Sequence, residues 1–223
     1  MLWRILDNPQ AGIAMFAMLI LALSVHEMAH AWMALKRGDD TAARMGRLTL
    51  NPAAHLDPMG LMFILMATIG WGKPVPINPL NLKDVRRDSM YIALAGPVSN
   101  IIQAIFLAII SRFLHLGYSD SIILKFPYGA TLHDACYLVT MYGVFINLAL
   151  AFFNLIPLFP LDGEKILAGI LPYKHAILLE GIRQHSMMIL LGIIVLGMVF
   201  NIHVLGFYFN LVVFPLTGLL LGG

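Results

Sequence analysis

Residues 11–35 read AGIAMFAMLILALSVHEMAHAWMAL, an apolar run that is long enough to cross a lipid bilayer as one helix. Three ionisable side chains interrupt this run, namely His26, Glu27 and His30. Such groups are costly inside a membrane, so their presence there indicates a functional site. On a helix the residues at positions i and i+4 share a face, so both imidazoles can reach one metal ion, with Glu27 beside it. The alternative is a pair of histidines packed against other helices, with Glu27 hydrogen-bonded.

The composition extends the membrane prediction to the whole chain. Apolar residues make up 60% of the 223 positions and charged residues 12%, whereas roughly a quarter of the residues in a soluble domain are charged. At about 20 apolar residues per span, this composition could supply about six spans. The net charge of +2, without a basic stretch interleaved with aromatics, argues against nucleic acid as a partner. The single cysteine, Cys136, excludes an internal disulfide.

We expect one membrane-embedded domain over residues 1–223, with an all-α fold. After the first span, full spans are predicted over residues 90–114 and 132–155, because both stretches are apolar and long enough to cross. Together the three spans form a predicted core within residues 11–165. The lipid bilayer is therefore the surrounding medium for most of the chain.

The remaining segments are less regular. Residues 59–71 are apolar but too short to cross, so we predict a re-entrant element there, beside a short membrane-associated β-hairpin after the first span. Residues 117–131 indicate an exposed loop. Residues 187–221 could form two short spans if the chain turns near residues 201–203, or one long tilted helix if it does not. With these C-terminal spans, the predicted total is about five or six.

Lysine and arginine are distributed unevenly between the two sides of the predicted spans. If residues 59–71 do not cross, one side holds 11 of the 14 basic residues and the other side only Arg4, Arg112 and Lys125. Cytosolic loops carry the excess of lysine and arginine, so the richer side is predicted to be cytosolic. We expect a multi-pass protein of the cell membrane, with the candidate site near the cytosolic side, because His30 lies toward that end of its span.

A catalytic zinc ion needs three protein ligands and one open position, so a further ligand must accompany the two histidines. Residues 154–163 read NLIPLFPLDG, in which two prolines stop regular helix before Asp162 and Gly163 permits a tight turn after it. Asp162 lies at a cytosolic span end, as the histidines do, which makes it the candidate third ligand. The alternative is an aspartate that caps a helix. His55 and Asp57 are alternative ligands by residue type, although the prolines and glycine around them favour a turn.

The motif HEMAH at residues 26–30, followed by NLIPLFPLDG at residues 154–163, resembles the site-2 protease family, the intramembrane zinc metalloproteases of peptidase family M50. Further stretches agree with this family, and they occur in its order: GRLTLNP at 46–52, HLDPMG at 55–60 and AGPVSN at 95–100. The combination of motifs is far more specific than the first motif alone.

The resemblance implies a three-span core that holds one Zn²⁺ inside the membrane, with His26, His30 and Asp162 as ligands and Glu27 as the catalytic base. It implies hydrolysis of peptide bonds within or near the transmembrane segments of membrane-protein substrates. The chain is similar to a compact member without a PDZ or CBS module, so we expect control through prior trimming of the substrate or through a regulatory membrane partner. The alternatives are a zinc-handling membrane transporter and an inactive scaffold of the same fold.

Two further predictions concern how a substrate is held. Asn100, Asn147 and Asn154 are polar groups on the other two core spans, where they could orient substrate or stabilise an oxyanion. Hydrogen bonding between helices is an equal alternative for them. Residues 45–50 (MGRLTL) alternate in polarity and are rich in strand formers, so we predict an open strand edge to which an unwound substrate adds. The alternative is a hairpin that only covers the site.

Overall fold

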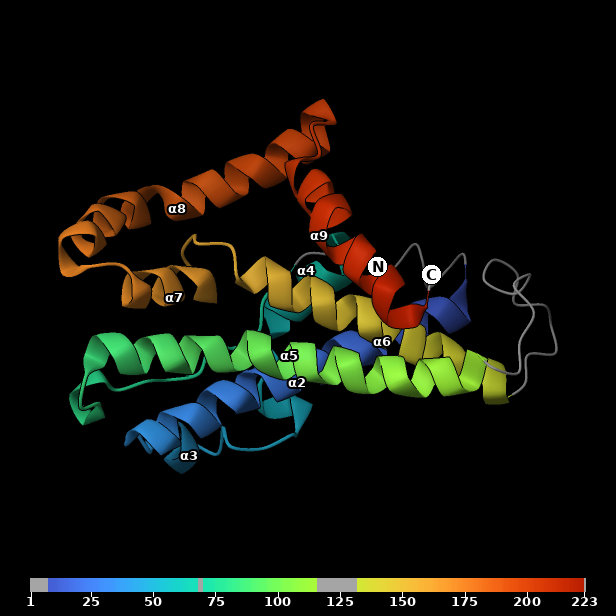
Figure 1. Ribbon diagram of the computed structural model, residues 1–223, viewed down its shortest axis with the longest axis horizontal. Coiled ribbons are helices and arrows are strands. Elements are labelled where there is room, and N and C mark those ends of the chain that lie inside the picture. The colour runs from blue at the N-terminus through green and yellow to red at the C-terminus, as the bar shows by residue number, and fades with distance from the viewer. Residues whose placement is uncertain (1–7, 68–69, 116–131, 223) are drawn as a thin grey trace.

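The computed structural model describes residues 8–67, 70–115 and 132–222, and the regular secondary structure within them is helical (Figure 1). Four of its helices are long and apolar enough to cross a membrane: α2 (Pro9–Arg37), α5 (Val85–His115), α6 (Leu132–Asn154) and α9 (Val204–Leu221). The chain is therefore a multi-pass membrane protein, as its composition predicts. The loop predicted at residues 117–131 lies outside the described residues.

Local signals at both ends define α2, which carries the two histidines. Asn8 caps the first turn by accepting a hydrogen bond from the N–H of Ala11 (3.1 Å), and Pro9 occupies the first helical position, where no N–H is needed. At the other end, Gly38 has a φ of +107°, a left-handed conformation that favours glycine and ends the helix. The 29 residues of α2 are about 44 Å long, which exceeds the roughly 30 Å of a hydrocarbon core.

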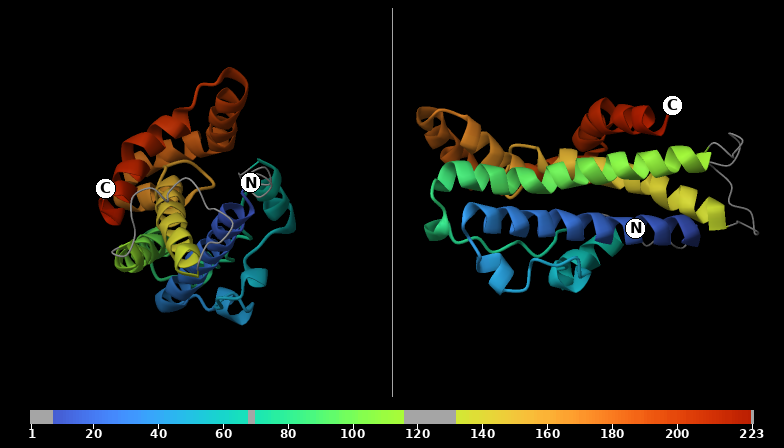
Figure 2. Two further views of the ribbon diagram at one scale, coloured as in Figure 1. Left: turned by 90° about the vertical axis from the view of Figure 1, so that its right-hand side faces the viewer. Right: turned by 60° about the horizontal axis from the view of Figure 1, so that its bottom comes forward.

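Helices α2, α5 and α6 pack against one another as a three-helix bundle, in which α5 runs antiparallel to the other two (Figures 1 and 2). Ala104 and Ala108 of α5 pack with Val144 of α6, and Ala22 of α2 packs with Ile146 of α6. Small side chains let helices approach closely where no hydrophobic effect drives them together. The bundle places the C-terminal ends of α2 and α6 and the N-terminal end of α5 on one side of the molecule.

The segment between α2 and α5 is not the β-hairpin that the sequence predicts. Its described residues form two short helices, α3 (Thr41–Arg44) and α4 (Pro58–Ala67), two single 3₁₀ turns (Pro52–Ala54 and Pro79–Asn81) and one isolated bridge between Leu56 and Gly72. The physical reason is the proline content, because proline lacks the N–H that a strand ladder requires. Prolines stand at five positions of this segment: Pro52, Pro58, Pro74, Pro76 and Pro79.

The strand edge predicted at residues 45–50 is wrong as well. These residues lie in turns and bends, and Gly46 has a left-handed φ of +70° that interrupts any extended run. The helix α4 occupies most of the apolar stretch at residues 59–71, for which a short re-entrant element is predicted. The segment between α2 and α5 is thus a folded cap of turns and short helices beside α2.

The C-terminal region turns where the sequence places a possible turn. Helix α8 (Tyr173–Phe200) ends at Asn201, which has a left-handed φ of +56°, and α9 begins at Val204. Among the described residues four helices are candidate spans and Gly181–Gly197 of α8 is a shorter apolar stretch, whereas about five or six spans are predicted.

Two arginines of α5 cap the C-terminal ends of two later helices, α7 and α9. Arg86 donates to the carbonyl oxygens of Ala168 (2.7 Å) and Gly169 (3.3 Å), at the C-terminal end of α7 (Asp162–Ile170). Arg112 donates to two carbonyl oxygens in the last turn of α9. A cation at this end of a helix satisfies carbonyl groups that have no partner within the helix and interacts favourably with the helix dipole. Helix α8 instead packs on α7 and α9 and lies away from the bundle (Figure 1).

Candidate metal centre

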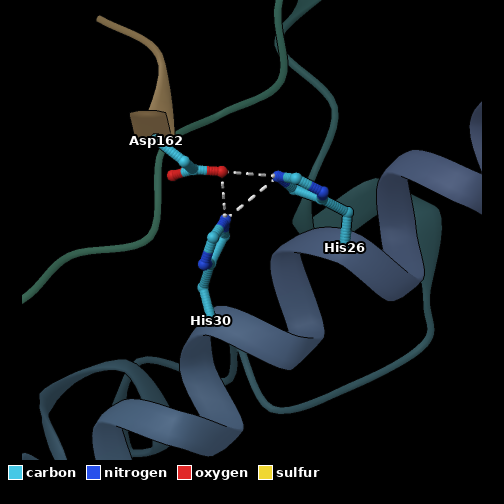
Figure 3. A group of neighbouring side chains, drawn as sticks. All are labelled: His26, His30 and Asp162. Atoms are coloured by element: carbon cyan, nitrogen blue, oxygen red, sulfur yellow. Dashed lines mark hydrogen bonds and ion pairs between the residues drawn. The ribbon is translucent and has the colours of Figure 1, made fainter. Parts of the chain in front are cut away.

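Three side chains from α2 and α7 converge on one point (Figure 3). His26 and His30 stand one helical turn apart on α2, and their Nε2 atoms are 3.0 Å from each other. The Oδ2 atom of Asp162, the first residue of α7, is 3.2 Å from each of these nitrogens. Both imidazoles are buried, with exposed fractions of 3% and 7%. The structure therefore brings together the three residues that the sequence indicates as metal ligands.

The connection between α6 and α7 returns the chain to the two histidines. Helix α6 ends at Asn154 and α7 begins at Asp162 itself, so the tight turn predicted after this aspartate is wrong. Gly163 is needed for another reason, because a Cβ at this position would collide with the backbone carbonyl oxygens of Leu155 and Ile156. Without a side chain there, the start of α7 packs closely against the end of α6.

The hydrogen bonds made by the Nδ1 atoms show which nitrogen of each imidazole carries the proton. His30 Nδ1 lies 2.7 Å from the carbonyl oxygen of Ile92, and a carbonyl only accepts, so Nδ1 carries the proton. His26 Nδ1 donates in the same way to Oδ1 of Asn100, at 2.6 Å. In a neutral imidazole the other nitrogen, Nε2, is then an acceptor. Both Nε2 lone pairs therefore point toward the carboxylate.

Three lone pairs that point at one another favour a cation between them. Asp162 Oδ2 is buried and has no hydrogen-bond partner among the residues that the structure describes. Ligands at about 2.0–2.1 Å from a tetrahedral Zn²⁺ lie roughly 3.4 Å apart, close to the 3.0 and 3.2 Å separations of this group. The alternative is a protonated His30 whose Nε2–H is shared between Asp162 Oδ2 and His26 Nε2. The donor set therefore fits a divalent metal ion such as zinc.

Gly96 of α5 provides the space that the two adjacent imidazole rings occupy. A Cβ at this position would lie 2.5 Å from the Cε1 and Nε2 atoms of His30 and 2.6 Å from Cε1 of His26. Cβ atoms in real proteins do not approach other heavy atoms this closely, so glycine alone fits beside the pair. In the sequence AGPVSN is only a matching motif, because nothing local in it reveals that Gly96 contacts the two imidazoles.

Glu27 follows His26 on α2 and is half-buried, outside the group of three converging ligands. A buried arginine, Arg47, donates to the carbonyl oxygens of Lys73 (2.5 Å) and Pro74 (3.0 Å). Burial lowers the pKa of the Arg47 guanidinium, and the negative charge of Glu27 opposes that shift. Glu27 therefore lies within electrostatic reach of a buried cation. In the sequence Arg47 is only part of the GRLTLNP motif, because its closeness to the charge of Glu27 depends on the folded cap.

The three asparagines predicted to serve the substrate lie at different places. Asn100 and Asn147 are fully buried within the bundle, where Asn100 contacts His26 and Asn147 contacts Asn100. Asn154 is half-buried at the end of α6 and donates to the carbonyl oxygen of Leu150 in its own helix (3.0 Å). The first two asparagines thus take the interhelical hydrogen bonds that the sequence leaves as an alternative.

His55 and Asp57, the alternative ligands by residue type, lie outside the converging group in the described chain. His55 is fully buried, and its Nε2 donates to the carbonyl oxygen of Thr49 (2.7 Å). Asp57 accepts a hydrogen bond from the N–H of Gly60 (2.9 Å) at the start of α4. Both side chains hold the cap together, in the turn that the neighbouring prolines and glycine favour.

Comparison with known proteins points to one family. The model of peptidase family M50 matches residues 118–199. YwhC of Bacillus subtilis is 42% identical over 156 residues, which cover 69% of this chain and 67% of YwhC. Rip2 of Mycobacterium tuberculosis is 29% identical over 223 residues, which cover 95% of this chain and 78% of Rip2. The zinc metalloprotease MJ0392 of Methanocaldococcus jannaschii is 25% identical over 174 residues, or 78% of this chain and 39% of MJ0392.

YwhC and Rip2 carry the provisional name zinc metalloprotease. No solved structure matches this chain significantly. The segment matched by the family model includes Asp162, and the similarity to Rip2 extends over nearly the whole chain. The resemblance carried by the sequence motifs is thus confirmed: the chain belongs to peptidase family M50 and is a zinc metalloprotease.

Proposed function

We propose that this zinc metalloprotease hydrolyses peptide bonds within or near the transmembrane segments of membrane-protein substrates. The proposal is carried by the position of two of the converging side chains, His26 and His30, inside the candidate span α2. His26 and His30 precede Arg37, the end of α2, by 11 and 7 residues, so they lie about 17 Å and about 11 Å from it along the helix axis. A hydrocarbon core is about 30 Å thick, so a centred α2 extends about 7 Å beyond it at each end and holds His26 about 10 Å and His30 about 4 Å inside it. A peptide bond that reaches both side chains would then enter the bilayer.

In this proposal His26, His30 and Asp162 hold one Zn²⁺ per chain. Two imidazoles and one carboxylate leave a fourth position open, which is typical of catalytic zinc. When bound, the ion supplies Lewis-acid polarisation of a peptide carbonyl and lowers the pKa of water. Glu27 accepts the proton of the attacking water and donates it to the departing amine. The Nδ1 hydrogen bonds of both imidazoles keep the ligand atoms oriented while the proton moves.

We place the chain in the cell membrane, with the site toward the cytosol. The C-terminal end of α2, the N-terminal end of α5 and the helix α7 lie at the same end of the bundle (Figure 1). Basic residues mark the two span ends there: Lys36, Arg37, Arg86 and Arg87. An excess of such residues is typical of the cytosolic side. Water for hydrolysis would enter from this end, because the lipid interior contains none.

The variant Glu27→Gln tests the proposal, since it keeps the size and polarity of the side chain but removes the proton acceptor. We expect purified full-length protein in detergent to hold the same amount of zinc with either residue. Cleavage of a fluorescent peptide that contains one transmembrane segment should fall by about 100- to 10,000-fold in the variant.

Two results would contradict the proposal. Cleavage by the glutamine variant at the rate of the unmodified protein would remove Glu27 from the role of base. Unmodified protein that holds zinc, cleaves no membrane-spanning peptide and instead moves zinc into vesicles would favour the transporter.

If cleavage is found as expected, mass spectrometry of membrane peptides that accumulate in cells with Glu27→Gln would identify natural substrates.

A further inference from the structure

A chain of buried hydrogen bonds crosses all three helices of the bundle and ends at His26. It begins on α6 with Asn147, continues through Asn100 on α5 and reaches the imidazole on α2. Both asparagines have exposed fractions of 0%, and His26 of 3%. The amide nitrogen of Asn100 is 2.9 Å from Oδ1 of Asn147, and Oδ1 of Asn100 is 2.6 Å from Nδ1 of His26.

Backbone carbonyl groups give this chain a single direction. Asn147 Nδ2 donates to the carbonyl oxygen of Gly143 (2.9 Å), which can only accept, so Oδ1 of Asn147 must face Asn100. Asn100 Nδ2 then donates both of its hydrogens, one to Asn147 Oδ1 (2.9 Å) and one to the carbonyl oxygen of Ala22 (3.2 Å). The remaining group of Asn100, Oδ1, faces His26 and can only accept. The proton of His26 must therefore stand on Nδ1.

The reverse orientation of Asn100 is excluded by the same contacts. Turning its amide over would bring Oδ1 against two other acceptors, Asn147 Oδ1 and the carbonyl oxygen of Ala22. Two buried hydrogen bonds would be replaced by two repulsive contacts, in a region where no water can compensate them. In the observed orientation every polar atom of the Asn100 side chain is used, so its amide has no hydrogen left for a substrate carbonyl.

The two imidazoles differ in how they are oriented. His30 donates to a backbone carbonyl, that of Ile92, which no side-chain substitution removes. His26 depends entirely on the side chain of Asn100 for the corresponding hydrogen bond. If Asn100 were lost, His26 could place its proton on Nε2 and would then no longer present a lone pair to a metal ion.

We propose that Asn100 and Asn147 are positioning residues that fix the tautomer of His26. Asn147 orients Asn100, and Asn100 holds the proton of His26 on Nδ1, so that Nε2 is available as a ligand. This inference rests on the proposed ligand role of His26, and it replaces the substrate-contacting role predicted for these two asparagines.

Zinc affinity, measured by competition with a chromophoric chelator on purified full-length protein, provides the first test. Asn100→Leu keeps the volume but removes the acceptor, so zinc affinity should fall by about 10- to 100-fold. Asn100→Asp keeps an acceptor toward Nδ1 but sets its second oxygen against Asn147 Oδ1 and the carbonyl oxygen of Ala22, so it should restore only part of that affinity. Asn147→Leu should have a smaller effect, because Ala22 still orients Asn100. Thr140→Val is the matched control, since Thr140 is a buried polar residue of α6 that bonds within its own helix.

Nitrogen-15 spectra of histidine-labelled, metal-free protein provide the second test, which needs no variant at the asparagines and no proteolytic activity. The His26 signal, assigned with the variant His26→Gln, should show the Nδ1-protonated tautomer in the unmodified sequence. A predominantly Nε2-protonated His26 would overturn the proposal even if Asn100→Leu fails to fold. Equal zinc affinity in folded Asn100→Leu and unmodified protein would overturn it as well. Failure of the proposed proteolysis would leave both readouts intact, so the two proposals are tested separately.

Discussion

Replacing Gly96 with alanine should displace the imidazoles from the metal site. The new Cβ would start 2.5 Å from the ring of His30 and 2.6 Å from the ring of His26, whereas ordinary contacts begin at 3.4 Å. The rings or the α5 backbone must therefore separate by about 0.9 Å. Metal–ligand distances vary by only about 0.2 Å from their usual values. A displacement of this size cannot be absorbed while both imidazoles remain ligands.

Neither way of making room preserves the Nδ1 hydrogen bonds of the imidazoles. If the rings swing away from α5, the Nδ1 hydrogen bonds to Ile92 (2.7 Å) and Asn100 (2.6 Å) lengthen. If α5 moves away instead, it carries both acceptors with it, because both belong to this helix. We expect zinc affinity to fall by about 100-fold, the upper end of the effect of losing groups that orient ligands. Cleavage should fall at least as far, because a misplacement near 1 Å alone costs about 100-fold in rate.

Chelator competition on purified full-length protein measures this effect, and thermal unfolding shows whether the variant is folded. Gly192→Ala on α8 is the matched control, because a Cβ there has no heavy atom within 4 Å apart from its chain neighbours and the backbone of its own helix. Its zinc affinity and cleavage rate should equal those of the unmodified protein. A folded Gly96→Ala variant that binds zinc as tightly as this control would refute the reasoning, since the rings would then not be confined by α5.

Asp162→Ala should lose zinc and activity, because two imidazoles alone do not offset the charge of the ion, whereas Asp57→Ala should keep its metal. Metal analysis of both purified variants tests this. The reverse pattern would contradict the ligand set. Burial raises the pKa of Asp39, but hydrogen bonds from Thr41 and Asn81 outweigh it and hold the pKa below its ordinary value. This stabilisation is complete above the ordinary pKa of about 4 and is lost as the pH falls through the lower folded value. The Tm difference between unmodified protein and Asp39→Asn should therefore shrink below about pH 4, and a constant difference in acid would contradict the assignment.

The candidate metal ligands that the structure brings together could be predicted from sequence because their signals are local. The spacing of His26 and His30 determines their common face on any helix, whatever surrounds it. Asp162 could be added because the order of the predicted spans places both motifs at the same side of the bilayer. This inference needs the number of spans between the motifs but not how the helices pack. The turn at Asn201 could be predicted for the same reason, since polar residues separate two apolar stretches there. These features depend little on how helices pack.

The features that the sequence did not reveal depend on packing between distant segments. The strand prediction for residues 45–50 followed local propensity, which the turn at Gly46 and the prolines farther along overrode. The roles of Gly96 and Asn100 require knowing which face of α5 meets α2, because a glycine or asparagine in an apolar helix can equally serve helix packing alone. The electrostatic effect of Glu27 on Arg47 likewise exists only once the cap is folded.

Helix α5 contributes none of the three candidate ligands but contacts both imidazoles. The carbonyl of Ile92, the bare backbone of Gly96 and the amide of Asn100 recur every four residues along α5, so they form one stripe that faces α2. Arg86, at the start of the same helix, binds the C-terminal end of α7 and so restrains the element that begins with Asp162. Because these contacts belong to one rigid helix, a shift of α5 against α2 would disturb both imidazoles at once. The metal site therefore depends on the packing of the bundle as a whole, including contacts far from the ligands.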